Sequence, residues 1–398
     1  MSHGDRHFDV VILGGGNAGI SAAARLIRAG LRDVAVIEPQ TVHTYRPLLS
    51  YVGGGQADLS AAERTQRSVT PRECTWIRDH ALAVDADRAT VHCDSGRTYR
   101  YTDLIVGTGL VPDTAELPGI DTAIQAPTVT SNYLDHAEKT WRLVRALPPG
   151  GRAVFTVPRP PVSCTGTTVK PLFLAADHWR RTGRQTALDL TLVVDRPSLL
   201  GITEIDSRVS EALQQLGVRV RYDSRVETVD VDAGELTIAS SGAAETLDFD
   251  LLHIVPPFRG PSWVHESGLA GQNPHGLVDI DAGTLRHRSR PDVWAAGDGA
   301  AVDTDPSGGA LRRQIATLVH NLLAARRGQA LAHYDGYSVA PITTDARHLI
   351  AGEFYRSGAI ASSLPSFVDS TKPRRSAWVF DRYILPRLYW RQILKGRL

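Results

Sequence analysis

The hydrophobic pattern of the amino-terminal segment predicts a strand, a helix and a second strand in succession. Residues 10–13 are all apolar, as a parallel strand buried on both faces requires. Apolar side chains then recur at helical spacing between residues 20 and 27, and Gly30 is placed to end that helix. A second apolar run follows at residues 34–37. This order is typical of a parallel α/β sheet.

The turn between the first strand and the helix is rich in glycine and fits the pattern GxGxxG. Gly14 permits the tight turn, Gly16 lets the backbone approach a pyrophosphate, and Gly19 lets the helix pack closely on the strand. The helix N-terminus offers N–H groups to phosphates, and Glu38 is placed to accept a hydrogen bond from a ribose hydroxyl. A bare GxGxxG is often only a flexible turn, but the flanking elements predict a dinucleotide site. Its residues are Gly14, Gly16, Asn17, Ala18, Gly19 and Glu38.

Two later segments have the form of a short apolar strand that ends in a glycine turn. Residues 101–112 contain GTG at 107–109, and residues 291–300 contain GDG at 297–299. Taken singly, either could be an ordinary strand and turn. All three glycine turns in this order form a specific pattern.

A further apolar strand, at residues 153–157, ends differently. It runs into the sequence PRPP at 158–161. Prolines lack N–H donors, and no glycine is present to let a pyrophosphate approach. A nicotinamide nucleotide bound in the usual way at this second strand is therefore not expected, and electrons must come from another donor.

Cys164 follows this strand and precedes a helical pattern at residues 169–176. A helix N-terminus favours the thiolate, which would make Cys164 a candidate for chemistry. The alternative is a buried cysteine that behaves as a small apolar residue, and Cys74 and Cys93 are interpreted in that way. His43 and His348 could carry protons, but structural roles are the default for both.

Aromatic and apolar residues recur at helical spacing with arginines between them in the C-terminal tail, at residues 378–397. This pattern predicts two short amphipathic helices separated by Pro386. Such helices can lie in a bilayer interface, or they can pack on the protein core or on a second subunit. The pattern alone does not decide among these.

The composition places the chain among ordinary globular proteins. Its 398 residues suggest two or three compact units, with 42% hydrophobic and 22% charged residues. Lys+Arg is 44 against Asp+Glu 43, so the balance does not indicate a nucleic-acid partner. Nearly all positive charge is arginine, which suggests a GC-rich bacterial gene. Lysine occurs at Lys139, Lys170, Lys372 and Lys395.

The N-terminal residues and the cysteines indicate the cellular compartment of the protein and whether it binds a metal. The first seven residues are polar and show no signal-peptide pattern, and no stretch reaches the ~20 apolar residues of a membrane span. We therefore expect a cytoplasmic protein. The three cysteines lie far apart without a CxxC pair, which argues against a zinc site and against a disulfide scaffold. No metal is expected.

Several motifs together resemble the sulfide:quinone oxidoreductases, a family of flavoproteins with two dinucleotide-binding domains. They span nearly the whole chain: the glycine turns above, VHTYRPL at 42–48 with VGGG at 52–55, KTW at 139–141, GRAVFTVP at 151–158, PVSCTG at 161–166, YDGY at 334–337 and LPRLYWRQILKGR at 385–397. The resemblance implies FAD as the cofactor, with Thr108, Gly109 and Asp298 near the flavin half of FAD. It also implies that Cys164 is the catalytic thiol and that the tail lies on a membrane and guards a quinone site.

The chain departs from that family at two places. The family uses a second cysteine, whose position is taken here by Ala340, and a lysine expected before Gln314 is replaced by Pro306 and Ser307. Alanine can neither carry sulfur nor form a disulfide. The enzyme could therefore work with one thiol and pass sulfur to an external acceptor, or it could act on another substrate.

The sequence thus predicts an α/β protein with two Rossmann-like domains and a C-terminal amphipathic segment. The FAD domain is expected at 1–118 and 275–330, the second domain at 119–274 and the tail at 331–398. The expected function is oxidation of sulfide or a related reduced sulfur species through Cys164 and FAD, with quinone as acceptor. A homo-oligomer and a location on the inner face of the cytoplasmic membrane are further expectations. The alternatives are a flavoenzyme for an organic thiol or another metabolite, and a silent FAD-binding sensor or scaffold.

Overall fold

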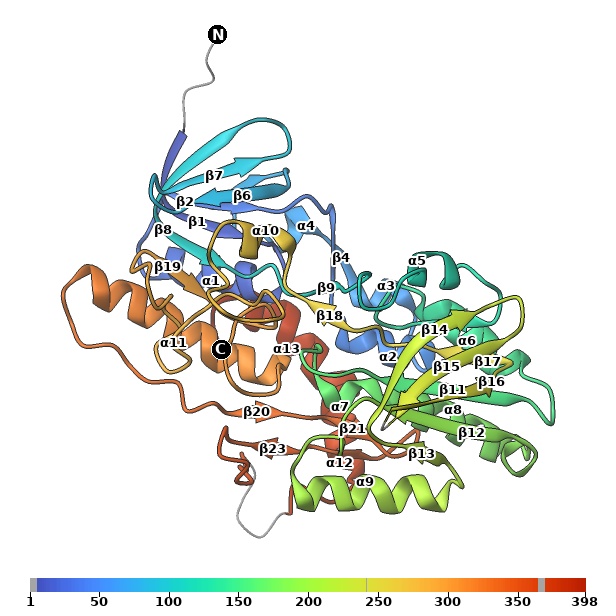
Figure 1. Cartoon of the computed structure of the whole chain (residues 1–398). Helices are drawn as coiled ribbons and strands as arrows, with labels where there is room; N and C mark the ends of the chain where they lie inside the picture. Colours follow the sequence, from blue (N-terminus) through green and yellow to red (C-terminus); the bar gives the residue numbers. More distant parts are fainter. Residues whose placement is uncertain (1–5, 241, 364–368) are drawn as a thin grey trace.

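The computed structural model of the chain describes residues 6–240, 242–363 and 369–398. Two separate sheets dominate the molecule, and the C-terminal segment lies between them (Figure 1). The second sheet is parallel, whereas the first is parallel except for the antiparallel pairs β6–β7 and β7–β8. The fold is therefore α/β with two Rossmann-like units, as the hydrophobic pattern predicts.

The first sheet is built on the predicted strand–helix–strand unit. β1 (Arg6–Leu13) pairs in parallel with β2 (Val34–Ile37), and α1 (Asn17–Arg28) connects them. The four apolar residues at the end of β1 are fully buried, because helices cover both faces of a parallel sheet. The strand order is β5-β2-β1-β8-β7-β6, with β19 paired to β8. The remaining strands are β5 (Thr75–Ile77), β6 (Ala81–Asp85), β7 (Thr90–Cys93), β8 (Thr98–Val106) and β19 (Val293–Ala295).

An excursion between β2 and β5 lies next to this sheet, and α11 (Gly308–Arg326) packs against α1. In Figure 1 this long helix lies below the first sheet. The excursion contains β3 (Val42–Thr44), α2 (Pro47–Gly53), α3 (Leu59–Ala62), β4 (Glu63–Thr65) and α4 (Gln66–Val69).

The second sheet has five parallel strands in the order β10-β17-β11-β12-β13. A three-stranded antiparallel sheet, β14-β15-β16, extends from it. The strands are β10 (Val129–Thr130), β11 (Arg152–Val157), β12 (Asp189–Val194), β13 (Arg219–Arg221), β14 (Ser224–Asp230), β15 (Glu235–Ser240), β16 (Ala243–Asp248) and β17 (Leu251–His253). The helices here are α5 (Ile120–Ala123), α6 (Ala137–Ala146), α7 (Thr165–Thr168), α8 (Lys170–Arg181), η1 (Gln185–Ala187) and α9 (Thr203–Gln215).

Short two-stranded pairings connect these units. β9 (Val111–Pro112) pairs with β18 (Phe258–Arg259), which ties the exit from the first sheet to the return from the second. The other short elements are α10 (Ser262–Glu266), β20 (Ser338–Val339), β21 (Ile342–Thr343), β22 (Leu349–Ile350) and β23 (Glu353–Phe354). The strands of the first sheet come from residues 6–106 and 293–295, and those of the second from 129–253. The exact domain bounds stay a prediction.

The C-terminal tail differs from the predicted pair of helices divided by Pro386. Its elements are α12 (Arg375–Val379), the π-helical turn η2 (Phe380–Ile384), α13 (Leu385–Arg391) and η3 (Ile393–Lys395). The chain stays helical through Pro386, because this proline lies in the first turn of α13, where a missing N–H costs little. A π-helical turn, with i→i+5 hydrogen bonding, precedes it.

The apolar side chains of the tail do not form the one face that their spacing predicts. Tyr389, Ile393 and Leu394 are buried in the core of the first sheet. Phe380, Tyr383 and Ile384 are instead exposed, at 45%, 42% and 42% of their surface. Part of the tail is therefore a packing surface, and part is open to a partner. Within the described residues, no helix is both long and apolar enough to span a bilayer.

Candidate functional site

The three predicted glycine turns meet at one edge of the first sheet. β1, β8 and β19 run in parallel side by side, so the turns that follow them lie together. A Cβ atom on Gly14 would lie 2.7 Å from the carbonyl oxygen of Gly107 and 3.0 Å from the Cα of Thr108. A Cβ on Gly299 would lie 2.5 Å from the oxygen of Gly109. Thr108, Gly109 and the loop of Asp298 are thus brought together.

The glycines of the first turn differ in their surroundings, as a dinucleotide loop requires. A Cβ on Gly19 would lie 1.9 Å from the oxygen of Gly14, so only glycine lets α1 pack this closely on the turn. Gly14 has a φ of 92°, in the left-handed region. Among the described residues, no atom lies within 4 Å of a Cβ built on Gly16. This open space before Asn17 and Ala18, at the start of α1, fits a bound pyrophosphate.

Glu38 lies beside this turn at the end of β2. Its Oε2 accepts the N–H of Gly15 at 2.7 Å, and its Oε1 accepts the N–H of Gln40 at 2.7 Å. Two further residues also reach the oxygen of Gly15. The Nε2 of Gln66 donates to it at 3.0 Å, and the Nδ1 of His43 lies 3.0 Å from it. Gln66 lies in no recognisable motif, and although His43 lies in the segment VHTYRPL, only the fold shows that it reaches this loop.

Asp298 connects the first sheet to the segment that carries Cys164. The N–H of Gly297, the preceding residue, donates to the Oε1 of Gln314 at 2.9 Å, which fixes the turn on α11. Burial raises the pKa of Asp298, while a hydrogen bond from the Ser163 side chain opposes this shift. Because Ser163 precedes Cys164, the predicted flavin-side aspartate and the predicted catalytic thiol lie at the same place.

Cys164 caps α7 with a φ of 58°, a left-handed conformation unusual for a residue with a side chain. The Tyr133 hydroxyl donates to the carbonyl oxygens of Ser163 at 3.0 Å and Cys164 at 3.3 Å, which holds this turn. The hydroxyl of Thr167 donates to the Cys164 Sγ at 3.1 Å.

The protonation state of Cys164 differs from the sequence-based expectation. Burial raises the pKa of the Cys164 thiol to about 12, and the charge of Asp305 adds to the shift. Because α7 has only four residues and burial disfavours the charged sulfur, these surroundings favour the thiol rather than the predicted thiolate. The catalytic role of Cys164 stays a prediction. Cys74 and Cys93 are buried, and burial raises the pKa of each to about 12. Both agree with the structural role predicted for them.

Ala340 packs directly against the helix that follows Cys164. It is fully buried, and a Cβ on Gly166 would lie 2.9 Å from the Ala340 Cβ. Ala340, predicted to take the place of the family's second thiol, thus brings a buried methyl group against the first turn after Cys164. Ser307, near the position of the missing lysine, caps α11 by accepting the N–H of Ala310 at 3.1 Å.

Charged side chains, rather than glycine, surround the loop that follows β11. Arg159 pairs with Glu116 and with Asp113, the latter at 3.4 Å. Arg196, from the end of β12, donates to the carbonyl oxygen of Pro158 at 2.7 Å. The carboxyl end of β11 thus carries arginine side chains that are held by their own ion pairs and hydrogen bonds, and the absence of a nicotinamide nucleotide there stays a prediction.

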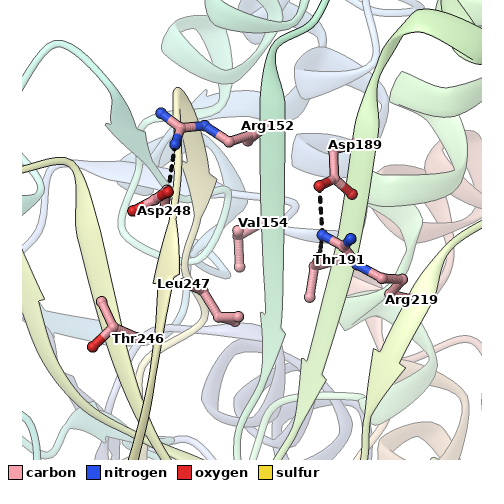
Figure 2. Close-up of a pocket in the computed structure, with 8 residues that line it drawn as sticks. All are labelled: Arg152, Val154, Asp189, Thr191, Arg219, Thr246, Leu247 and Asp248. Atoms are coloured by element: carbon pink, nitrogen blue, oxygen red, sulfur yellow. Dashed lines mark hydrogen bonds and ion pairs between the residues drawn. The ribbon is translucent and has the colours of Figure 1, made fainter.

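A surface cavity of about 180 Å³ lies at the opposite, amino-terminal ends of these strands (Figure 2). Figure 2 shows its two arginines turned toward carboxylates rather than toward the open space. Arg152 pairs with Asp248 at 2.7 Å, and Arg219 pairs with Asp189 at 2.5 Å. Because these charges are already satisfied, we assign no ligand to this cavity. The described residues also contain no cluster of His, Cys, Asp or Glu suited to a metal ion.

The tail reaches both sheets through buried polar contacts. The His43 Nε2 lies 2.6 Å from the Tyr389 hydroxyl, which links α13 to the glycine loop. Lys170, fully buried on α8, pairs with Asp381 at 2.8 Å, and the Tyr51 hydroxyl donates to the same carboxylate at 2.6 Å. His348, in contrast, pairs with a surface aspartate away from these contacts. The surroundings of His348 agree with the structural role expected for it, whereas His43 lies at the dinucleotide loop.

Comparison with known proteins gives the same family as the motifs. The family model "Pyridine nucleotide-disulphide oxidoreductase" matches residues 8–151. The chain is 31% identical to the mitochondrial sulfide:quinone oxidoreductase of Dictyostelium discoideum over 98% of this chain and 86% of that protein. It is 29% identical to the mitochondrial sulfide:quinone oxidoreductase of Mus musculus over 98% of this chain and 87% of that protein.

Among solved structures, the sulfide:quinone oxidoreductase of the bacterium Aquifex aeolicus superposes with a TM-score of 0.79. The two are 16% identical, and the match covers 98% of this chain and 92% of the other. The similarity to the sequence relatives extends over both sheets and the tail, not over a single nucleotide-binding unit. The chain therefore belongs to the sulfide:quinone oxidoreductase family of FAD-dependent oxidoreductases.

Proposed function

We propose that this enzyme oxidises sulfide at Cys164 and passes the electrons through FAD to a quinone. The observation that carries the proposal is the contact between the Ser163 side chain and Asp298, which brings the neighbouring thiol to the cofactor edge of the first sheet. Bound FAD supplies a two-electron acceptor there. The protein contributes the thiol, the orientation of the substrate and the exclusion of water.

The cofactor would be held by residues from all three glycine turns. Gly14, Gly16, Gly19 and the amides of Asn17 and Ala18 would bind the pyrophosphate, and Glu38 the ribose. Thr108, Gly109 and Asp298 would lie along the flavin half. The open space at Gly16 and the convergence of the turns support this arrangement.

A single-thiol reaction follows from Ala340. With a buried methyl group beside Cys164, no second side-chain thiol is available at that place to keep the oxidised sulfur. Sulfide, a small thiol acceptor and quinone would then yield a persulfide of the acceptor and quinol, with two electrons and two protons moving to the quinone. The methyl group of Ala340 also favours the second candidate function, in which the substrate is an organic thiol instead of sulfide, because the two-thiol route for sulfide is absent there.

The exposed side of the tail is the proposed contact with the membrane that holds the quinone. Phe380, Tyr383 and Ile384 present apolar surface, and Arg387 lies exposed beside them. Apolar side chains with flanking arginines suit an anionic bilayer surface. Peripheral attachment, a bacterial origin and the cytoplasmic face of the membrane remain proposals, as does self-association.

Steady-state assays separate these candidates. Purified holoenzyme would be given a water-soluble quinone with either sulfide or an organic thiol as donor, with and without a second thiol as sulfur acceptor. We expect sulfide-dependent quinone reduction that requires the added acceptor for repeated turnover. Quinone reduction with the organic thiol alone would favour the second candidate, and no reduction with any donor would leave the silent FAD-binding protein.

A further inference from the structure

Asp305 lies in the loop before α11, beside the first turn of α7. Its Oδ2 accepts the N–H of Thr165 at 3.2 Å, and its Oδ1 accepts the Thr165 hydroxyl. The Ser338 hydroxyl donates to its carbonyl oxygen at 2.5 Å. The next residue in that strand, Val339, has its carbonyl oxygen 3.9 Å from the Cys164 Sγ. Asp305 thus forms hydrogen bonds with the two segments that flank the thiol, one at Thr165 and one at Ser338.

The charged groups that face Asp305 come from three other segments. Burial raises the pKa of Asp305 to about 6, the hydrogen bonds from Thr165 and the charge of Arg196 oppose the shift, and Asp298 adds to it. The guanidinium of Arg196 also donates to the Thr165 hydroxyl at 3.2 Å. Tyr133 lies near the same carboxylate, and its pKa is raised well above the usual value by burial, so it stays neutral. Asp305 can therefore change its charge near neutral pH.

The charges that face Cys164 oppose each other. After burial, the charge of Asp305 is the largest influence that raises the pKa of the thiol. The hydrogen bond from Thr167 and the positive charge of Lys170 lower it. Tyr45 also lies near the thiol but is held neutral by burial, which raises its pKa well above the usual value. Asp305 is thus the negative side chain that most opposes thiolate formation.

We propose that Asp305 is a positioning residue that controls the protonation of Cys164. Its carboxylate holds the first turn of α7, which carries the thiol, and its negative charge keeps the proton on sulfur. When Asp305 binds a proton, that opposition is removed. Conversely, when the proton leaves Sγ, the carboxylate takes one up more readily, because two negative charges at this site oppose each other. The inference goes beyond the proposed function and rests on it only in taking Cys164 as the reacting thiol.

The test is the pH dependence of Cys164 alkylation in the flavin-loaded protein. Iodoacetamide would be added between about pH 5 and about pH 9, and modification of the Cys164 peptide would be followed by mass spectrometry, with Cys164→Ala as background. Because ionisation of Asp305 raises the pKa of the thiol, the logarithm of the rate should rise, stay level for about one pH unit just above pH 6, and rise again. A profile with no level region would overturn the proposal.

Two substitutions sharpen the test. Asp305→Asn keeps an oxygen for Thr165 but has no charge, so we expect a profile without the level region and about tenfold faster alkylation at pH 8. Asp305→Glu keeps the charge and should keep the level region. An Asp305→Asn profile like that of the wild type would contradict the proposal. If Asp305→Asn loses flavin, Asp305→Ser serves as the neutral variant, and the wild-type profile decides the matter by itself. Since no sulfide is used, a failure of sulfide oxidation would leave this result intact.

Discussion

At the carboxyl end of β1 the chain turns through glycines, whereas at the carboxyl end of β11 it turns through prolines and an arginine. Both strands lie within parallel sheets and are followed by a helix. In the first turn the backbone approaches closely and leaves open space at Gly16. In the second, Arg159 and Arg196 fill the corresponding place with their own hydrogen bonds. Two similar frameworks therefore differ in what they can bind.

The comparison indicates which features a Rossmann-like sheet needs in order to bind a dinucleotide. Binding needs unpaired N–H groups at a helix N-terminus and a backbone that a phosphate can approach. The second sheet has instead acquired a thiol at the start of its helix. In the proposed reaction, its carboxyl edge would supply the thiol of Cys164 to the cofactor held by the first sheet.

The largest expected effect is that of Gly19→Ala in the first turn. The added methyl would lie 1.9 Å from the backbone oxygen of Gly14, which has little freedom to move. We expect a loss of about 3 kcal/mol or more in the free energy of unfolding, together with loss of bound FAD. Denaturant unfolding and the flavin absorbance of the purified protein would measure both.

Gly16→Ala is the matched control, since nothing among the described residues lies within 4 Å of its added methyl. The fold should remain within about 1 kcal/mol of the wild type, while FAD affinity falls because the methyl occupies space proposed for the pyrophosphate. Equal FAD affinity in this variant and the wild type would contradict the assignment of that space.

An intermediate effect is expected from His253 in the second sheet. It is fully buried, its Nε2 accepts the N–H of Asn132 at 3.1 Å, and burial lowers its pKa to about 3. Below about pH 6.5 the His253 imidazole is protonated in the unfolded chain but stays neutral in the folded chain. The free energy of unfolding therefore decreases as pH falls from 6.5 toward 3. At pH 5 this loss should be about 2 kcal/mol.

His253→Gln removes the titration but keeps an acceptor for Asn132. Denaturant unfolding at pH 7 and pH 5 should show a smaller acid-induced loss in this variant than in the wild type. The same loss in both proteins would mean that other groups cause the acid sensitivity of the second sheet.

The smallest expected effect is that of Arg159→Ala in the second turn. Its ion pairs with Asp113 and Glu116 are partly exposed, so their loss should cost about 1 kcal/mol. FAD should still not be reduced by NADH, because the prolines around position 159 supply no N–H groups to a pyrophosphate. Reduction by NADH in this variant would show that the arginine alone closes the site.

The sequence was most informative where function depends on the backbone. The strand, glycine turn and helix of residues 10–30 are dictated by local sterics, so their prediction agrees with β1, Gly14 and α1. Cys164 and Asp298 follow recognisable strands, but the resemblance to the sulfide:quinone oxidoreductases was needed to select them as candidate site residues. That they lie together, through Ser163, depends on how the two sheets pack.

Other features depended on long-range packing and were missed or wrong. Arg196 and Asp305 meet at Thr165 although no local pattern marks either residue. The burial that raises the pKa of the Cys164 thiol is set by tertiary packing, so helix position in the sequence could not predict it. The tail was predicted as one amphipathic face, but Tyr389 packs into the core of the first sheet. Spacing alone could not distinguish a bilayer from a protein surface.

The most direct test of the account is an anaerobic titration of the FAD-loaded protein with sulfide, followed by flavin absorbance. The wild type and Cys93→Ala should be bleached by sulfide, whereas Cys164→Ser should retain FAD and stay oxidised. A parallel titration with NADH should leave all three oxidised. Bleaching of Cys164→Ser by sulfide, or of the wild type by NADH alone, would contradict the assignment of the thiol at the second sheet as the group that links the donor to FAD.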